Sequence, residues 1–289
     1  INKNDKFNPI FGNLNDLAKF LDDKNHDVII SSEEFDTIIN PEPLIKLRDA
    51  FSAKFDIIII GYLRPQEELL QSHWKTKVKF RGFPESFEDW ISTALEDQEF
   101  LEFDKWLGNF ASVFGKESLR FKIYNPKAEN LFFSFLELCG VTNFDALITP
   151  ETKNISAPNL TLDLYRRFYM RRDQDGNHSP LAKKCYDRVS KIIEDFLQSQ
   201  NLETHYSMYS HARLKQVRDR YRDSNIRTAK NYFNQHKLFT APSRITPMKH
   251  DMIDVLSASQ ATKLGSLLVH MERDRLMKPG SKKRKSNSD

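Results

Sequence analysis

Short apolar runs alternate with longer amphipathic segments through the first half of the chain. Three runs that are rich in β-branched or alternating apolar residues predict strands at residues 27–31, 56–63 and 119–124. Apolar positions three or four residues apart predict helices between and around these runs, at 13–21, 41–54, from Pro65 onward, 87–95, 103–114 and 129–139. This order of strands and helices predicts an α/β fold with a parallel, doubly wound sheet.

The pattern changes after Gly140. The second half consists of long segments without a strand pattern, which predict helices at 158–172, 180–200, 210–235 and 249–277. We therefore expect three parts, which are an α/β core at 1–150, a helical region packed on it at 151–277, and a disordered basic tail at 278–289.

Composition narrows the class of protein. Of the 289 residues, 39% are hydrophobic and 12% aromatic, enough for an apolar core, and the net charge of +4 does not favour nucleic acid as a partner. The longest apolar run, 57–63, is far shorter than the ~20 residues of a membrane-spanning helix, and no secretory signal pattern is evident. Cys139 and Cys185 fit reduced thiols, so we expect a cytoplasmic protein without a membrane span.

Several other residues show no pattern in the sequence that defines a functional site. The histidines lack the spacing of a zinc site, so we expect no metal. Trp74 is interpreted as a core or interface aromatic that lies close to the candidate site described next. Four arginines are interpreted as a solvated helical face, namely Arg166, Arg167, Arg171 and Arg172.

The candidate site lies where the second predicted strand ends. Parallel α/β sheets bind ligands beyond the carboxyl ends of their strands, and Arg64 is at such an end. A guanidinium fork binds phosphate, and the helix that begins at Pro65 adds the positive end of its dipole. Ser72 follows Arg64 by eight residues, on a helix face that Glu68 shares. Glu68 counts against a shared anion unless its carboxylate points away. The alternative is an arginine that pairs with a surface carboxylate and a serine that caps nothing.

Four segments, in order, resemble a known family. FDIIIIGYLRPQEELLQSHW resembles the 3′-phosphate-binding motif of nucleotide-dependent sulfotransferases, in which a serine follows eight residues after an arginine. DVIISSEEF resembles the strand and catalytic segment of a bacterial sulfotransferase-like group. LRFKIYNPKAENLFFSFLELCGV resembles the family's strand–Tyr–helix–Gly unit, and RYRDSNIRTAKNYFNQHKLF resembles the helix that closes the bacterial group. The resemblance covers 14–150 and 205–240 and implies a P-loop-like sulfotransferase core.

The resemblance also implies roles for particular residues. The donor would be 3′-phosphoadenosine 5′-phosphosulfate, and the acceptor a hydroxyl, expected to belong to a surface polysaccharide. Arg64 and Ser72 would hold the 3′-phosphate, and Tyr124 would lie near the adenine. Glu33 would be the general base, with Glu34 as the fallback assignment. From the residues alone, the two glutamates also fit a helix start, and Tyr124 also fits an aromatic at a sheet edge.

Two further classes of function stay open at this point. The first is a truncated or degenerate module that binds a nucleotide or a partner without catalysis. The second is a glycosyltransferase-like enzyme, which is disfavoured because no Asp-x-Asp metal motif lies at a strand end. The one candidate, Asp173 with Asp175, falls in a predicted loop of the helical half.

Sulfotransferases of this family bind the 5′-phosphosulfate with an N-terminal strand–loop–helix rich in Lys, Gly, Ser and Thr, and no such loop is recognisable before Val28. We interpret the chain as either a fragment or a degenerate relative. We expect the 289-residue chain by itself to transfer sulfate weakly or not at all, because the group that stabilises the leaving phosphate is missing. Clear transfer from sulfur-labelled donor by this chain alone would contradict the expectation.

Overall fold

The structure is a computed structural model, and it describes residues 13–22, 26–32, 35, 38–51, 54–97, 101–125, 130–144, 147–149, 158–170, 182–202, 207–240, 243, 245–247 and 256–277. The chain forms two compact units. The first comprises Ile1–Leu69, Ile91–Lys153 and Ala212–Ile245. The second comprises Leu70–Trp90, Asn154–His211 and Thr246–Asp289. The division at residue 150 that the sequence suggests stays a prediction.

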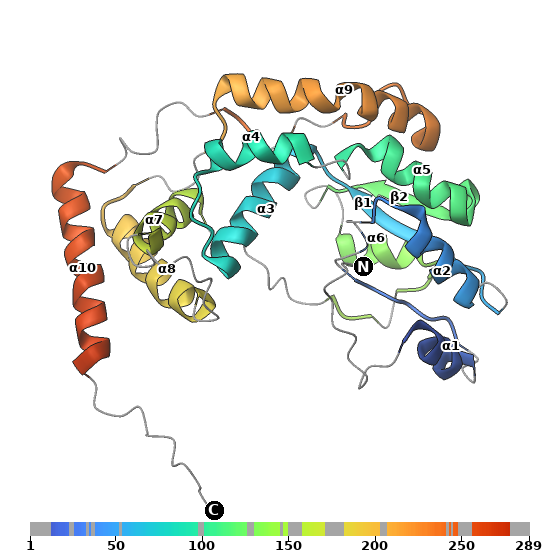
Figure 1. The fold of residues 1–289 in the computed structure, drawn as a ribbon, viewed down its shortest axis with the longest axis horizontal. Coiled ribbons are helices and arrows are strands. Elements are labelled where there is room, and N and C mark those ends of the chain that lie inside the picture. The colour runs from blue at the N-terminus through green and yellow to red at the C-terminus, as the bar shows by residue number, and fades with distance from the viewer. Residues whose placement is uncertain are drawn as a thin grey trace, which may run out of the picture. The chain divides into compact units, whose positions relative to one another are not determined.

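Helices make up most of the described chain (Figure 1). In chain order the elements are α1 (Leu14–Asp22), α2 (Pro41–Phe51), β1 (Ile59–Leu63), α3 (Gln66–Arg81), α4 (Phe87–Asp97), α5 (Phe103–Phe114), the 3₁₀ helix η3 (Lys116–Ser118), β2 (Leu119–Ile123), α6 (Leu131–Leu138), α7 (Asn159–Met170), α8 (Ala182–Ser199), α9 (His211–Phe233) and α10 (Ala258–Met277). Every predicted helix overlaps one of these, and the α/β class is confirmed in a mostly helical form.

The sheet consists of β1 and β2, which run parallel. The register pairs Ile59 with Leu119 at one end and Leu63 with Ile123 at the other. This confirms two of the three predicted strands and the parallel direction of their pairing. The wider sheet of a doubly wound fold is not seen among the described residues.

The prediction of a buried strand at 27–31 is wrong. These residues have no regular structure, and Val28, Ile29 and Ile30 are 39%, 61% and 44% exposed. No backbone hydrogen bond joins 27–31 to another part of the chain that the structure describes. The physical reason is that a β-branched run favours a strand only where a neighbouring strand and an apolar layer receive it, and here β1 and β2 pair with each other instead.

One face of the sheet is buried under α5, with α2 and α9 beside it. Side chains alternate along a strand, so β1 and β2 turn one apolar set to this side, which is Ile59, Leu63, Leu119, Phe121 and Ile123. They pack on buried residues at helical spacing along α5, which are Phe103, Leu107, Phe110 and Val113. Gly115, at φ 83°, then ends α5, since this left-handed conformation favours glycine.

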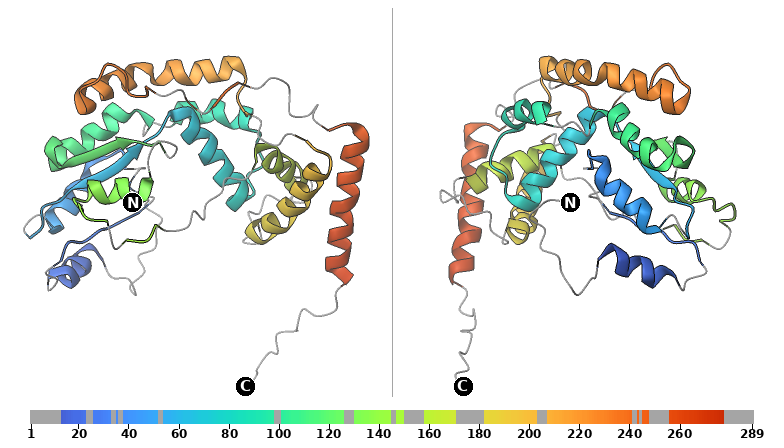
Figure 2. Two further views of the ribbon diagram at one scale, coloured as in Figure 1. Left: turned by 180° about the vertical axis from the view of Figure 1, so that it is seen from behind. Right: turned by 45° about the vertical axis from the view of Figure 1, so that its right-hand side comes forward.

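The opposite face of the sheet is polar and binds α6. The Nζ group of Lys122 donates to Ser134 Oγ at 3.0 Å, and the Tyr62 hydroxyl lies 3.1 Å from the same oxygen. The Nη1 group of Arg120 donates to the Leu138 carbonyl at 2.7 Å. Helices α5 and α6 therefore cover opposite sides of the strands, as two views show (Figures 1 and 2).

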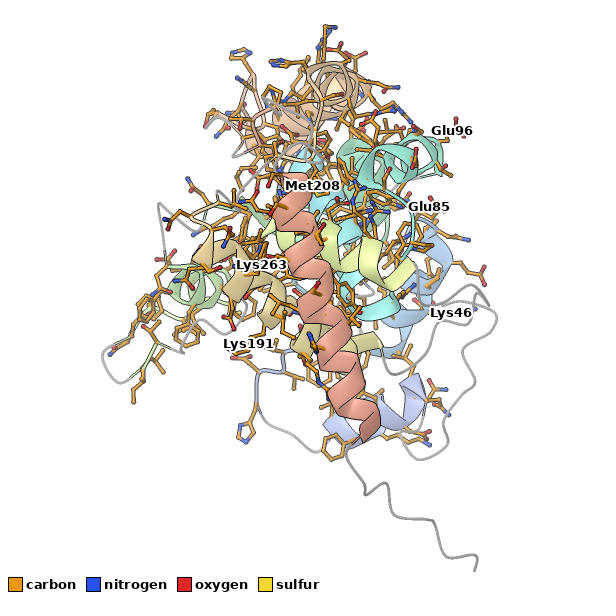
Figure 3. The ribbon with its side chains drawn as sticks, turned by 90° about the vertical axis from the view of Figure 1, so that its left-hand side faces the viewer. Lys46, Glu85, Glu96, Lys191, Met208 and Lys263 are labelled. Carbon is orange, nitrogen blue, oxygen red and sulfur yellow. The ribbon has the colours of Figure 1, made fainter. Side chains whose placement is uncertain are left out.

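The second unit is built from helices. Trp74 of α3 is fully buried and contacts the Phe87 ring edge-on, with 5.9 Å between the ring centres. The rings of Phe87 and Tyr209 also meet edge-on, with 4.7 Å between their centres. Tyr165 of α7 and Tyr186 of α8 make a similar contact at 5.1 Å. Helix α10 lies in the foreground of Figure 3, where the exposed Lys263 of α10 is labelled.

Gly61 is required by the close approach of Phe121 on the neighbouring strand. A Cβ at position 61 would lie 2.3 Å from a ring carbon of Phe121. We expect Gly61→Ala to lower the free energy of unfolding by about 1–3 kcal/mol, because the ring has to move within a packed layer. The urea midpoint of unfolding measures the change.

The matched control is Gly265→Ala in α10, where an added Cβ meets no atom within 4 Å. Because alanine favours a helix interior, this variant should be more stable than the parent by about 0.5–1 kcal/mol. Unchanged stability of Gly61→Ala would contradict the packing of Phe121 described above.

Candidate functional site

The ends of the two parallel strands bring Arg64 and Tyr124 together in the first unit. Arg64 follows β1 directly, and Tyr124 follows β2. The Tyr124 backbone N–H donates to the Leu63 carbonyl at 2.7 Å, which continues the pairing beyond β2. The Arg64 guanidinium carbon lies 5.3 Å from the centre of the Tyr124 ring, within cation–π range. Two residues that the sequence assigned to one nucleotide site are thus neighbours.

Arg64 also forms an ion pair, although its partner is a buried carboxylate and not the surface carboxylate of the alternative interpretation. Its Nε donates to Glu68 Oε2 at 2.8 Å. The carboxylate is buried, with 4% of the side chain exposed, whereas 30% of the Arg64 side chain is exposed. Ser243 Oγ lies 3.4 Å from the other carboxylate oxygen. The two Nη groups of Arg64 donate no hydrogen bond to any described residue. They can therefore donate to an anion.

The start of helix α3 positions both Arg64 and Glu68. Pro65 lies between Arg64 and the first helical residue, Gln66, and its carbonyl accepts the backbone N–H groups of Glu68 and Leu69 at 2.9 and 3.1 Å. The positive end of the helix therefore lies immediately after Arg64. This part of α3, up to Leu69, belongs to the first unit.

The roles of the remaining predicted site residues are not tested by the described contacts. Ser72 is half-buried on α3, in the part of that helix that belongs to the second unit, and its role beside Arg64 stays a prediction. Glu33 and Glu34 lie outside the described residues. Their assignment as general base also stays a prediction. Trp74, fully buried, donates its Nε1–H to the Glu85 carbonyl at 3.1 Å and is a core residue.

The sequence did not reveal how strongly α9 is tied to α3. Gln66 and Asn225 exchange two amide hydrogen bonds, at 2.8 and 3.0 Å, and Gln66 also donates to the Leu101 carbonyl at 3.2 Å. Arg218 Nε donates to Glu67 Oε1 at 2.9 Å. The first turn of α3 is therefore held by side chains of α9, and the position of Arg64 depends on this contact.

The same helix binds the start of α5 through two more acidic residues. Arg220 donates to Glu102 at 2.8 Å, and both Arg227 and Ser224 donate to Asp104. The spacing of seven between Arg220 and Arg227 places both on one flank of α9. This spacing was the signal that could have indicated the contact from the sequence.

The two carboxyl groups at the start of α5 titrate below their usual range. Burial by itself would raise the pKa of Glu102, but the hydrogen bonds and charges of Lys105 and Arg220 lower it by more. Burial would likewise raise the pKa of Asp104, and hydrogen bonds from Arg227, Ser224 and the backbone of Lys105 outweigh it. Both groups are therefore carboxylates at neutral pH.

The interpretation of Arg166 as part of a solvated helix face is wrong. The residue is 6% exposed and pairs with the buried Asp163 at 2.8 Å. Its Nη1 donates to the Pro84 carbonyl at 2.7 Å. Arg167 also pairs with Asp163, whereas Arg171 and Arg172 lie outside the described residues, as does the Asp173–Asp175 segment.

Comparison with protein-family models, with curated proteins and with solved structures found no match to this chain. In the described ranges, no group of three His, Cys, Asp or Glu side chains is placed to hold a metal ion. The helices described also include none that is long and apolar enough to cross a membrane. Arg64 and its neighbours are therefore the part of the described structure that indicates a function.

The lowered pKa values of Asp104 and Glu102 predict a pH dependence of stability. A carboxyl group whose pKa is lower in the folded state stabilises the fold fully above its unfolded-state pKa, about 4, and this contribution is lost progressively as the pH falls from there through the lower folded-state pKa. Asp104→Asn should therefore be less stable than the parent by about 1–2 kcal/mol at pH 7, with a smaller difference at about pH 3.

Urea unfolding at both pH values measures this difference. Asp49→Asn is the control, because Asp49 is 59% exposed and pairs only with the neighbouring Arg48 among the described residues. A difference for Asp104→Asn that is equal at both pH values would contradict the assigned charge.

Proposed function

We propose that this chain is a sulfotransferase-family protein that binds a 3′-phosphorylated adenine nucleotide at the carboxyl ends of β1 and β2. The observation that carries the proposal is the pairing of Arg64 with Tyr124, at 5.3 Å, at the edge where parallel sheets bind ligands. A phosphate needs fixed positive charge, and an adenine needs an aromatic or apolar face. Both kinds of group are adjacent here.

The phosphate would bind at the tip of the Arg64 fork. An end-on phosphate uses the two Nη groups, and the Nε bond to Glu68 leaves both in place. The start of α3 contributes its positive dipole end to the same region. In this arrangement Tyr124 presents its ring to the guanidinium, and the adenine would lie near this aromatic side chain.

The finer parts of the proposal are supported by the resemblance of the four sequence segments. They are a P-loop-like parallel core, 3′-phosphoadenosine 5′-phosphosulfate as the donor, and a carbohydrate hydroxyl as the acceptor. A cytoplasmic location is proposed from the two cysteines, Cys139 and Cys185, which fit reduced thiols. In the reaction, the acceptor oxygen attacks sulfur while the bond from sulfur to the 5′-phosphate oxygen breaks. The hydroxyl proton passes to the carboxylate of Glu33 or Glu34, and adenosine 3′,5′-bisphosphate leaves. Ser72 would add a second bond to the 3′-phosphate.

A second candidate is a non-catalytic module of the same fold, and the ion pair of Arg64 with the buried Glu68 favours it. Removing one partner of such a pair leaves a buried charge without compensation, so Arg64 has a structural role whether or not a nucleotide binds. If this module binds a partner instead of a nucleotide, Arg64 does not contribute to nucleotide affinity.

Calorimetry with adenosine 3′,5′-bisphosphate tests the proposal. We expect Arg64→Ala to weaken binding by about 10- to 100-fold, the scale of a charge-assisted phosphate contact. Arg48→Ala is the matched control, because Arg48 also pairs with a neighbouring carboxylate but lies on α2. It should bind like the parent. Equal affinity of the parent and Arg64→Ala would overturn the nucleotide site and leave the structural role.

A further inference from the structure

The edge of β1 that faces away from β2 has no backbone partner among the described residues. The Leu63 carbonyl accepts from the Tyr124 N–H, and in a parallel pair alternate residues turn both backbone groups to the same side. Leu63 and every second residue before it therefore face β2, whereas Ile60 and Tyr62 face the opposite edge. No described residue forms a backbone hydrogen bond with Ile60 or Tyr62. β1 thus has an open strand edge.

The sequence of β1 does not protect this edge. Proteins commonly block an open edge with a charged side chain or a proline, because unpaired backbone groups otherwise bind another extended chain. Residues 57–63, IIIIGYL, contain neither a charge nor a proline. Within the described sheet, only β2 pairs with β1. The edge is therefore able to accept a further strand.

The same unit exposes a segment that fits this edge. Val28, Ile29 and Ile30 are consecutive β-branched residues, and all three are exposed. Their backbone makes no hydrogen bond to another part of the chain that the structure describes. Residues of this type favour extended backbone and are stabilised when a neighbouring strand pairs with them. Each copy of the chain thus presents an open edge and an unpaired segment that is suited to form a strand.

Both flanks of this segment are anchored elsewhere in the first unit. Before it, α1 packs on α2, and Leu21 near the end of α1 is buried. After it, the Asn109 side-chain amide of α5 donates to the Ile39 carbonyl at 2.6 Å, and Ile38 packs on the buried Leu44 of α2. With its flanks held in this way, the segment stays unpaired in its own chain and is available to another molecule.

We propose that two copies of this chain exchange these segments, so that residues 27–31 of each copy add as a strand to the open β1 edge of the other. Each copy gives one segment and receives one, and the contact therefore closes as a two-fold dimer. Each added strand satisfies the outward backbone groups of Ile60 and Tyr62. It also removes apolar surface of Val28, Ile29 and Ile30 from water. The second copy supplies both halves of the contact, so no other partner is needed.

Size-exclusion chromatography with light scattering tests the dimer. At micromolar concentrations the parent should have twice the 33.9 kDa mass of one chain. Ile29→Pro should raise the concentration of half-dimerisation at least tenfold, because proline lacks the N–H that a strand pair requires. Ile148→Pro is the matched control, since Ile148 is 90% exposed and also lies outside any helix or strand. It should dimerise like the parent.

A parent that is monomeric at every concentration overturns the proposal, as does equal weakening by the two prolines. The urea midpoint of Ile29→Pro should equal that of Ile148→Pro, measured at a concentration where both are monomeric. This result shows that the first unit still folds, so that the loss of dimer reports on the segment itself.

Disulfide formation identifies the strand that receives the segment. Ile29→Cys and Ile60→Cys are prepared as separate proteins, each with Cys139→Ser and Cys185→Ser, and are mixed under mild oxidation. A disulfide between the two variants can form only between copies, and we expect it as the main product. If Ile29→Cys links mainly to itself, the segments pair with each other. If a chain that carries both substitutions links mainly within the monomer, the segment pairs with its own β1. Either result overturns the exchange.

Discussion

Parallel pairing of β1 with β2 is the constraint on which the rest of the first unit depends. The two strands are far apart in the sequence, and only their pairing brings Arg64 beside Tyr124. The pairing in turn needs Gly61, because the Phe121 ring occupies the space that any side chain would fill. It also needs the cover of α5, whose apolar face buries one side of both strands. The candidate site is therefore a consequence of backbone geometry and of one packed layer.

Around this layer, buried carboxylates at helix starts meet arginines. Glu67 and Glu68 open α3, and Glu102 lies at the start of α5; each is less than 10% exposed and paired. A helix start favours negative charge, but burial disfavours it unless a cation is near. Helix α9 provides most of these cations. Its basic character therefore fits internal ion pairs, whereas from the sequence alone it could be taken for a surface that attracts anions.

Much of the fold could be predicted, and the failures have physical causes. Periodicity located the helices and two strands, and α5 shows why, since its buried residues Phe103, Leu107, Phe110 and Val113 follow the helical spacing of its sequence. The same reasoning failed at Val28–Ile30, whose apolar run remains exposed. It also failed at Arg166, since periodicity places a residue on a helix face without telling which neighbour covers that face. The propensity of a segment for a helix or a strand depends on its own residues, whereas the burial of its side chains depends on residues distant in the sequence.

For the candidate site, the sequence by itself determined that Arg64 follows a buried strand and opens a helix, because a β-branched run, an arginine and a proline stand in that order. It also showed that Glu68 and Ser72 share one face of that helix. The tertiary structure decided that Tyr124 covers the guanidinium, that Glu68 is buried against it, and that α9 holds the first turn of α3. These contacts join segments distant in the chain, and no local pattern encodes distances between such segments.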